Sequence, residues 1–141
     1  MKHVFIDTNV LLDALKDTRP MHREGKRILS LASQGIIKGT VSTQSIVDVA
    51  FIYTKGHKER MEELKALVRY YDSIFTIADA TRHCLMMAAS HYYDDFEDAV
   101  QTSIAIDNCC DLIISGDKGF DGTFGPPVVS PDEFCRVFFE E

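Results

Sequence analysis

The sequence lacks a long hydrophobic run. No stretch of about 18 apolar residues occurs in its 141 residues, and such a stretch is what a membrane-spanning helix requires. Its first residues, Met1-Lys2-His3, lead directly into an apolar segment, without the pattern of a signal peptide. We therefore expect a cytoplasmic protein that does not enter a membrane.

Cysteine and histidine are scarce and show no metal-binding spacing. The four cysteines, Cys84, Cys109, Cys110 and Cys135, form no C-x-x-C pair, and the five histidines form no H-x-x-x-H motif. We expect reduced, mostly buried cysteines, with neither a disulfide nor a zinc site. The sequence also lacks a G-x-S-x-G motif, which makes a serine or cysteine hydrolase the least favoured class.

Positive charge is scarce in the second half of the chain. The net charge is −7, but residues 1–70 carry +4 and residues 71–141 carry −11. This asymmetry suggests a mildly basic flank beside an acidic pit, although solvated helix faces explain the same charges. The basic flank comprises Lys16, Arg19, Arg23, Lys26 and Arg27.

Apolar strands alternate with amphipathic helices along the chain. Runs rich in β-branched and aromatic residues predict strands at residues 4–6, 36–41, 73–78, 111–115 and 128–129. Apolar residues at helical spacing predict the helices between them, one of them over residues 79–90. Because strands alternate with long helices, the strands should be parallel. The predicted fold class is α/β, a three-layer fold whose central, mostly parallel sheet is flanked by helices, in a single domain over residues 1–141.

Carboxylates follow the strands at one edge of this predicted sheet. Asp7 ends the first strand and Asp117 follows the fourth, so both should emerge where open α/β sheets bind ligands. Asp95 and Asp98 share one face at the start of a helix, because they are three residues apart. Asp48 lies one turn into the helix after the second strand. Four separate segments thus bring carboxylates to one crevice.

Clustered carboxylates predict a metal site. They repel one another unless they are protonated or share a cation. Oxygen ligands suit Mg²⁺ or Mn²⁺, and a pair of such ions about 3.5–4 Å apart can activate water and stabilise a leaving oxygen. The chemistry that fits is hydrolysis of a phosphodiester.

Each carboxylate also has an ordinary structural explanation. Asp7 could cap the following helix, Asp95 and Asp98 could cap and complement a helix dipole, Asp117 could belong to a turn, and Asp48 could be a solvated helix position. Taken singly, these explanations are preferred. Taken together, four such coincidences at one edge favour a functional site.

Three segments of the chain carry a resemblance to a known family. They are Ile6-Asp7-Thr8-Asn9-Val10-Leu11-Leu12-Asp13, Asp95-Phe96-Glu97-Asp98-Ala99-Val100-Gln101 and Leu112-Ile113-Ile114-Ser115-Gly116-Asp117-Lys118-Gly119-Phe120. In order and spacing they resemble the PIN-domain family, small metal-dependent ribonucleases that include the VapC-type toxins of bacterial toxin–antitoxin pairs. The resemblance spans nearly the whole chain and implies a PIN-like fold.

The resemblance implies a role for each candidate residue. The catalytic carboxylates would be Asp7, Asp48, Asp98 and Asp117. The metal ligands would be Asp7, Asp98 and Asp117, with Asp95 beside them. Asn9 would orient Asp7 through hydrogen bonds. Asp48 stands where relatives commonly carry Glu, and Ser115-Gly116 stand where many carry Thr-Arg.

The resemblance also implies a cofactor and partners. The cofactor would be Mg²⁺ or Mn²⁺, the substrate RNA, and the protein partners an antitoxin and a second copy in a homodimer. Our hypothesis for the basic flank is that four of its residues help to bind the RNA. These are Lys16, Arg19, Arg23 and Lys26.

Two alternatives remain beside the nuclease. A non-catalytic PIN-like binding module is supported by the departures at Asp48 and Gly116. A small-molecule phosphohydrolase would also place an aspartate after its first strand, but phosphatases of the haloacid dehalogenase type need a second aspartate where this chain has Asn9.

Overall fold

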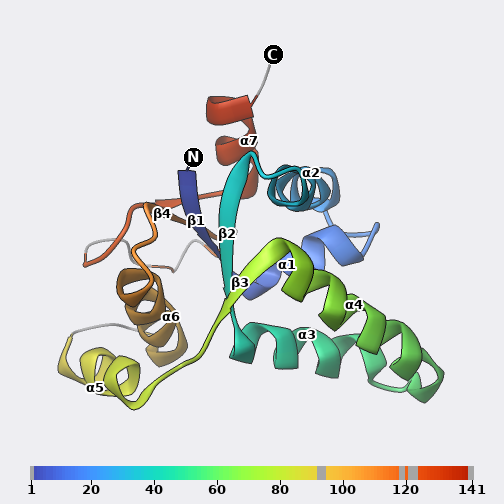
Figure 1. Ribbon diagram of the computed structural model, residues 1–141, viewed down its shortest axis with the longest axis horizontal. Coiled ribbons are helices and arrows are strands. Elements are labelled where there is room, and N and C mark those ends of the chain that lie inside the picture. Colours follow the sequence, from blue (N-terminus) through green and yellow to red (C-terminus); the bar gives the residue numbers. More distant parts are fainter. Residues whose placement is uncertain (1, 92–94, 118–119, 121–123, 140–141) are drawn as a thin grey trace.

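A central sheet carries helices on both faces (Figure 1). The computed structural model describes residues 2–91, 95–117, 120 and 124–139. Within these residues, the strands are β1 (Lys2–Ile6), β2 (Ile37–Ser42), β3 (Phe75–Ala78), β4 (Leu112–Ile114) and β5 (Val128–Val129). The helices are α1 (Thr8–Leu15), α2 (His22–Ser33), α3 (Thr43–Thr54), the 3-10 helix η1 (Lys58–Arg60), α4 (Met61–Ile74), α5 (Arg82–Ser90), α6 (Phe96–Asp107) and α7 (Pro131–Phe139).

The sheet has the order β3-β2-β1-β4-β5, and its paired strands are all parallel. Val4 of β1 lies opposite Gly39 of β2 and Leu112 of β4. The chain winds from β1 toward β3 on one side and continues from β4 to β5 on the other, so the winding reverses between β1 and β4. Ligand crevices of open α/β sheets lie at such a reversal, outside the carboxyl ends of the strands. The predicted α/β class is confirmed.

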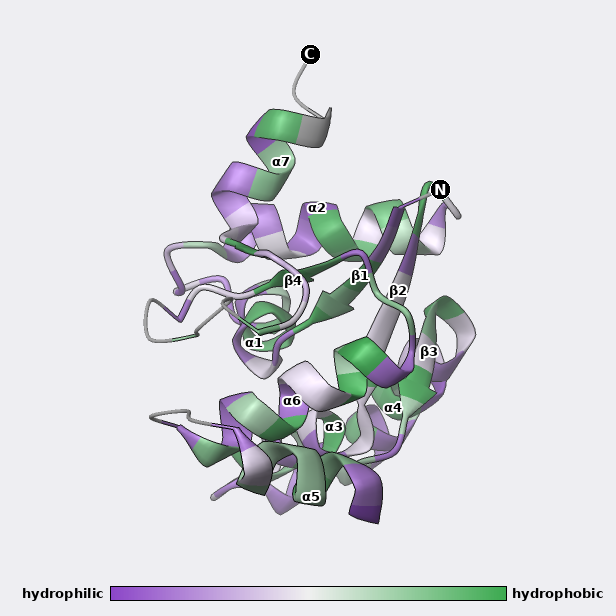
Figure 2. Cartoon of the chain, turned by 90° about the vertical axis from the view of Figure 1, so that its left-hand side faces the viewer, coloured by the Kyte–Doolittle hydropathy of each residue, from purple (hydrophilic) through white to green (hydrophobic). Residues whose placement is uncertain are grey.

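Side chains alternate across the sheet and fill a core on each face. Val4 and Ile6 of β1 belong to one apolar cluster, packed with α1, α2, α3, α4 and α7. Phe5 belongs to the other cluster, which contains Cys84 of α5 and Ile104 of α6. Figure 2 shows the hydrophobic colouring of β4 between these helical layers. Among the described helices, none is both long and apolar enough to cross a membrane.

Most predicted elements are found, with boundaries that differ from the expected ones by a few residues. The helix α4 continues to Ile74, so β3 starts at Phe75 rather than at residue 73. The helix α5 starts at Arg82 because Thr81 caps it, its hydroxyl accepting a hydrogen bond from the Cys84 amide. Ser42 caps α3 in the same way, accepting from the Ser45 amide at 3.0 Å.

Candidate functional site

Asp7 is fixed where β1 ends at the winding reversal. Its amide continues the ladder to β4, donating to the Ile114 carbonyl at 3.0 Å. The residue is only 5% exposed, and its side chain makes no capping hydrogen bond to α1. Instead, its carboxylate accepts two side-chain hydrogen bonds of 2.9 Å, from Gln101 Nε2 and Ser115 Oγ. The explanation of the Asp7 side chain as a helix cap is therefore wrong.

A buried polar network holds Gln101 in this position. The Oε1 atom of Gln101 accepts hydrogen bonds from Ser42 Oγ at 3.2 Å and from Ser45 Oγ at 3.4 Å. The Ser45 hydroxyl also lies 2.7 Å from Thr8 Oγ1. Ser42, Ser45 and Gln101 are all buried. Since buried polar groups are costly unless satisfied, these bonds give the Asp7 carboxylate one preferred orientation.

The first turn of α6 brings further carboxylates to this edge. Asp95 caps the helix, its Oδ1 accepting a hydrogen bond from the Asp98 amide at 3.0 Å, so its predicted capping role is confirmed. Asp98 is only 8% exposed. Burial, followed by the charges of Asp95, Asp117, Asp7 and Glu97, raises the pKa of Asp98 to about 7. Burial is also the main cause that raises the pKa of Asp7.

Asp117 joins this group from the loop after β4. It is exposed, and its amide donates to Ser115 Oγ at 3.1 Å, so Ser115 connects Asp117 to Asp7. The negative charge of Asp117 acts on both Asp7 and Asp98. The charges of the three aspartates expected as metal ligands therefore act on one another, although their carboxylate oxygens do not all lie within 4.8 Å of one another. Lys118 and Gly119, which complete the third motif, lie outside the described residues.

The composition of this acidic edge fits a hard divalent cation. Among the described residues, no lysine or arginine forms an ion pair with Asp7 or Asp98. The neighbouring charges that act on Asp98 are all negative. Carboxylate oxygens are the ligands of Mg²⁺ and Mn²⁺, and a bound cation would remove the repulsion that raises the pKa of Asp98. Asp7, Asp98 and Asp117 are therefore suitable ligands.

Asp48 is only indirectly connected to these three aspartates. Its Oδ1 accepts a hydrogen bond from Gln44 Nε2 at 2.9 Å, within α3. Its charge acts on Glu97, whose pKa is raised first by burial and then by Asp48, Asp95 and Asp7. Asp48 is not among the neighbours that shift the pKa of Asp7 or Asp98. Glu97, which was not predicted as a site residue, is the carboxylate on which the charges of both Asp48 and Asp7 act.

The residues that orient Asp7 differ from the expected one. Asn9 is exposed, and the side-chain hydrogen bonds to the Asp7 carboxylate come from Gln101 and Ser115. Gln101 could have been found from its spacing, because it follows Asp98 by three residues and so shares its face of α6. The sequence signal for Ser115 is a polar residue directly after a wholly apolar strand.

The expected RNA-binding residues lie away from the acidic edge. Asp7 precedes α1 and Lys16 follows it, so the eight residues of the helix separate them by about 12 Å. Arg19 is engaged with Asp13, its Nε lying 2.7 Å from Oδ1 of this buried carboxylate. Arg23 and Lys26 are exposed on α2. Arg23 and Lys26 of this flank are therefore surface cations, while Arg19 is paired with Asp13.

Comparisons with known proteins agree with this geometry. A family model described as PIN domain matches residues 3–119. Ribonuclease VapC1 from Aquifex aeolicus (strain VF5) is 26% identical over 137 residues, which cover 94% of this chain and 93% of the relative.

Solved structures share the fold. A toxin–antitoxin complex from Klebsiella pneumoniae has a TM-score of 0.64 at 21% identity, over 91% of this chain and 97% of the other. The Mycobacterium tuberculosis toxin VapC20, described as cleaving the sarcin–ricin loop, has a TM-score of 0.58 at 16% identity, over 86% of this chain and 92% of the other. Because the family model also spans most of the chain and includes Asp7, Asp98 and Asp117, the chain belongs to the PIN-domain family.

Proposed function

We propose that this protein is a metal-dependent endoribonuclease that hydrolyses RNA phosphodiester bonds, and that it is the toxin of a toxin–antitoxin pair. The observation that carries the proposal is the group of Asp7, Asp98 and Asp117 at the winding reversal, where burial, followed by the charges of the neighbouring carboxylates, raises the pKa of Asp98 to about 7. Membership of the PIN-domain family and the similarity to Ribonuclease VapC1 support the same activity.

The metal ligands in this proposal are Asp7, Asp98 and Asp117, with Asp95 at the rim. Mg²⁺ or Mn²⁺ bound to them supplies Lewis-acid activation of water and neutralises charge on the phosphate. Gln101 and Ser115 fix the Asp7 carboxylate, and each of its oxygens keeps a lone-pair site after accepting one hydrogen bond. Asp48 acts through Glu97 and tunes the charge of the site rather than binding the metal directly.

Partners extend the proposal beyond the active site. Similarity in fold to a chain of a toxin–antitoxin complex supports an antitoxin as protein partner. A homodimer is part of the same proposal. Coexpression with the product of a neighbouring gene, followed by mass measurement on a size-exclusion column, tests both the antitoxin and the homodimer. The mass of a single chain in every preparation would contradict both partners.

RNA cleavage tests the proposed activity. Wild type and Asp98→Asn are incubated with structured and unstructured RNAs in Mg²⁺, Mn²⁺ or EDTA, after circular dichroism has shown that both are folded. We expect cleavage by wild type that requires metal, with a loss of at least a hundredfold in the variant. Gln34→Ala, at an exposed residue next to α2, is a matched control that should cleave normally.

A non-catalytic binding module is the second candidate. It is favoured by the Gln44 bond to Asp48 and by Gly116, which leaves the loop after β4 without an arginine. Absence of cleavage by folded wild type with every metal and RNA, together with RNA retention that depends on metal, would support this module instead. Turnover of an aryl phosphate without RNA cleavage would instead support a phosphohydrolase.

A further inference from the structure

Three side chains that can each bind a transition metal meet between α5 and α6, apart from the acidic edge. His83 and Cys84 lie in the first turn of α5, and Asp107 is the last residue of α6. Their ligand atoms all lie within 4.8 Å of one another, and no other such group of three is found among the described residues. The spacing of cysteines and histidines in the sequence does not reveal this group, because only folding brings Asp107 to the adjacent His83 and Cys84.

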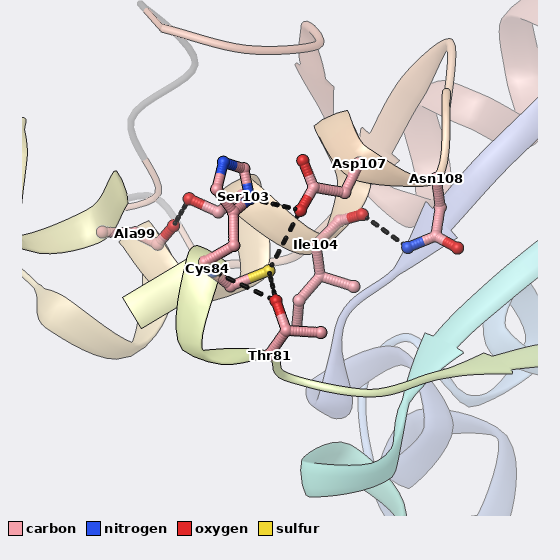
Figure 3. Close-up of polar contacts among 8 residues, drawn as sticks. Thr81, Cys84, Ala99, Ser103, Ile104, Asp107 and Asn108 are labelled. Carbon is pink, nitrogen blue, oxygen red and sulfur yellow. Dashed lines mark hydrogen bonds and ion pairs between the residues drawn. The ribbon is translucent and has the colours of Figure 1, made fainter. Parts of the chain in front are cut away.

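Two of the ligand atoms approach the third, a carboxylate oxygen of Asp107. Oδ2 of Asp107 lies 2.9 Å from His83 Nδ1 and 3.5 Å from Cys84 Sγ. Figure 3 shows the Cys84 sulfur between Thr81 and Asp107, with a dashed line to each. Tetrahedral zinc with ordinary bond lengths requires separations of about 3.4 Å for the nitrogen–oxygen pair and about 3.6 Å for the sulfur–oxygen pair. The sulfur–oxygen distance already fits, and the other needs to widen by about 0.5 Å.

The surroundings of Cys84 also suit a metal-bound thiolate. Thr81 Oγ1 donates to Cys84 Sγ at 3.4 Å and accepts from the Cys84 amide at 3.2 Å, so the sulfur has a fixed position and a hydrogen-bond donor. Such outer hydrogen bonds orient metal ligands. Cys84 is 1% exposed, whereas the side chain of His83 is 62% exposed and that of Asp107 is 34% exposed. The group is thus buried on the side of Cys84 and accessible to solvent on the side of His83 and Asp107.

We propose that His83 Nδ1, Cys84 Sγ and Asp107 Oδ2 form a zinc site in which water is the fourth ligand. Mixed nitrogen, sulfur and oxygen ligands suit zinc, and three protein ligands with one water is its common open arrangement. The Cys84 thiol releases its proton on binding, while the neutral imidazole carries its proton on Nε2. A thiolate and a carboxylate then balance the two charges of the ion, so the site is neutral.

The zinc site is separate from the proposed nuclease centre. Asp98 lies in the first turn of α6 and Asp107 at its end, so about 14 Å of helix separates the two groups. The ion would join the amino end of α5 to the carboxyl end of α6. The dipole of α6 favours a cation there, whereas the dipole of α5 favours the negative charge of the Cys84 thiolate. The proposal therefore stands independently of RNA cleavage and predicts a structural role, fixing the helix that carries Asp98.

Cobalt and zinc titrations test the site on the full chain. Reduced wild type is titrated with Co²⁺, which gives a thiolate charge-transfer band and intense visible bands in a tetrahedral sulfur-containing site, and is then competed with Zn²⁺. We expect one ion per chain, an uptake that releases one proton, and a rise in unfolding temperature with Zn²⁺.

Variants separate this site from others in the chain. His83→Ala changes an exposed side chain and should weaken Zn²⁺ binding at least tenfold, while Cys84→Ala should remove the thiolate band. Cys109→Ser, at an exposed cysteine, and Asp98→Asn, at the acidic edge, should keep the band. The absence of a thiolate band in wild type, its persistence in Cys84→Ala, or its loss in Cys109→Ser would overturn the proposal. Because His83 is exposed, an unchanged Zn²⁺ affinity in a folded His83→Ala would also overturn it.

Discussion

Gln101 Nε2 donates a 2.9 Å hydrogen bond to Asp7 Oδ1, across 94 residues of sequence, and this contact ties α6 to the carboxyl end of β1. Both side chains are buried, and the other end of the Gln101 amide accepts hydrogen bonds from Ser42 and Ser45. The orientation of the amide is therefore set from both sides. Its position makes Gln101 a positioning residue for the carboxylate that we propose as a metal ligand.

Replacing Gln101 should weaken Mg²⁺ binding more than it weakens RNA binding. In Gln101→Ala, Asp7 loses a hydrogen bond, so we expect the Mg²⁺ concentration for half-maximal cleavage to rise about 10- to 100-fold, the usual effect of removing a residue that orients a metal ligand. Cleavage is measured over a Mg²⁺ titration, with RNA retention as the second readout. Gln34→Ala, an exposed glutamine, is the control. An unchanged Mg²⁺ curve for a folded variant would contradict the role of Gln101.

Metal removal should make the stability of the protein depend on pH through Asp98. Its folded-state pKa of about 7 lies above the ordinary value of about 3.9, so the folded state binds this proton more tightly. The resulting stabilisation is complete below pH 4 and is lost as the pH rises to about 7. With each pKa unit corresponding to about 1.4 kcal/mol, the upper limit of this effect is about 4 kcal/mol.

Thermal unfolding in EDTA between pH 5.5 and pH 8 measures this dependence. Asp98→Asn keeps the shape of the side chain but cannot ionise, so it should gain stability relative to wild type as the pH rises. Saturating Mg²⁺ should reverse the order at pH 8, because only the wild-type carboxylate binds the cation well. A constant difference between the two proteins across this range would show that Asp98 titrates normally.

Some residues of the candidate site could be predicted from the sequence alone, and others could not. The place of Asp7, Asp98 and Asp117 at one edge was predictable because a parallel sheet brings the ends of its strands there, and in the structure their charges act on one another. The strand order was not predictable, because the local sequence pattern does not show on which side of an existing strand the next strand is added. Nor was the part played by Ser115, because its hydroxyl reaches Asp7 only through the pairing of β1 with β4.

Asp48 and Asp7 should differ in their effect on cleavage. Asp7→Asn removes a buried carboxylate of the proposed metal site and should abolish activity. Asp48→Asn changes a half-buried residue that is bonded to Gln44 and acts on Glu97, so we expect a loss on the order of tenfold, comparable to the loss of an outer partner. Single-turnover rates at saturating Mn²⁺ compare them, and equal losses would show that Asp48 contacts the metal.

Gly116 offers a place where phosphate binding can be added. Among the described residues, the nearest atom to a Cβ atom built on Gly116 is Cδ of Pro131 at 4.0 Å, so a Cβ atom has room there. An arginine there would reach solvent beside Asp117 and present a planar donor to phosphate. We expect Gly116→Arg to bind RNA several-fold more tightly at low salt and to cleave faster below saturation. Gly116→Gln is the uncharged control, and an equal gain in both variants would exclude a charge effect.

The basic flank makes a prediction about the salt dependence of RNA binding. Arg23 and Lys26 are exposed on α2, whereas Arg19 is held by Asp13, so these two are exposed cations of the flank that phosphate can reach. Reversing both, in Arg23→Glu with Lys26→Glu, should weaken RNA binding and lower the slope of log affinity against log salt by about 1.4, since each single-strand phosphate contact contributes about 0.7. Lys58→Glu with Lys65→Glu, exposed charges on η1 and α4, is the matched control. An unchanged slope in the α2 variant would mean that RNA reaches the acidic edge from another side.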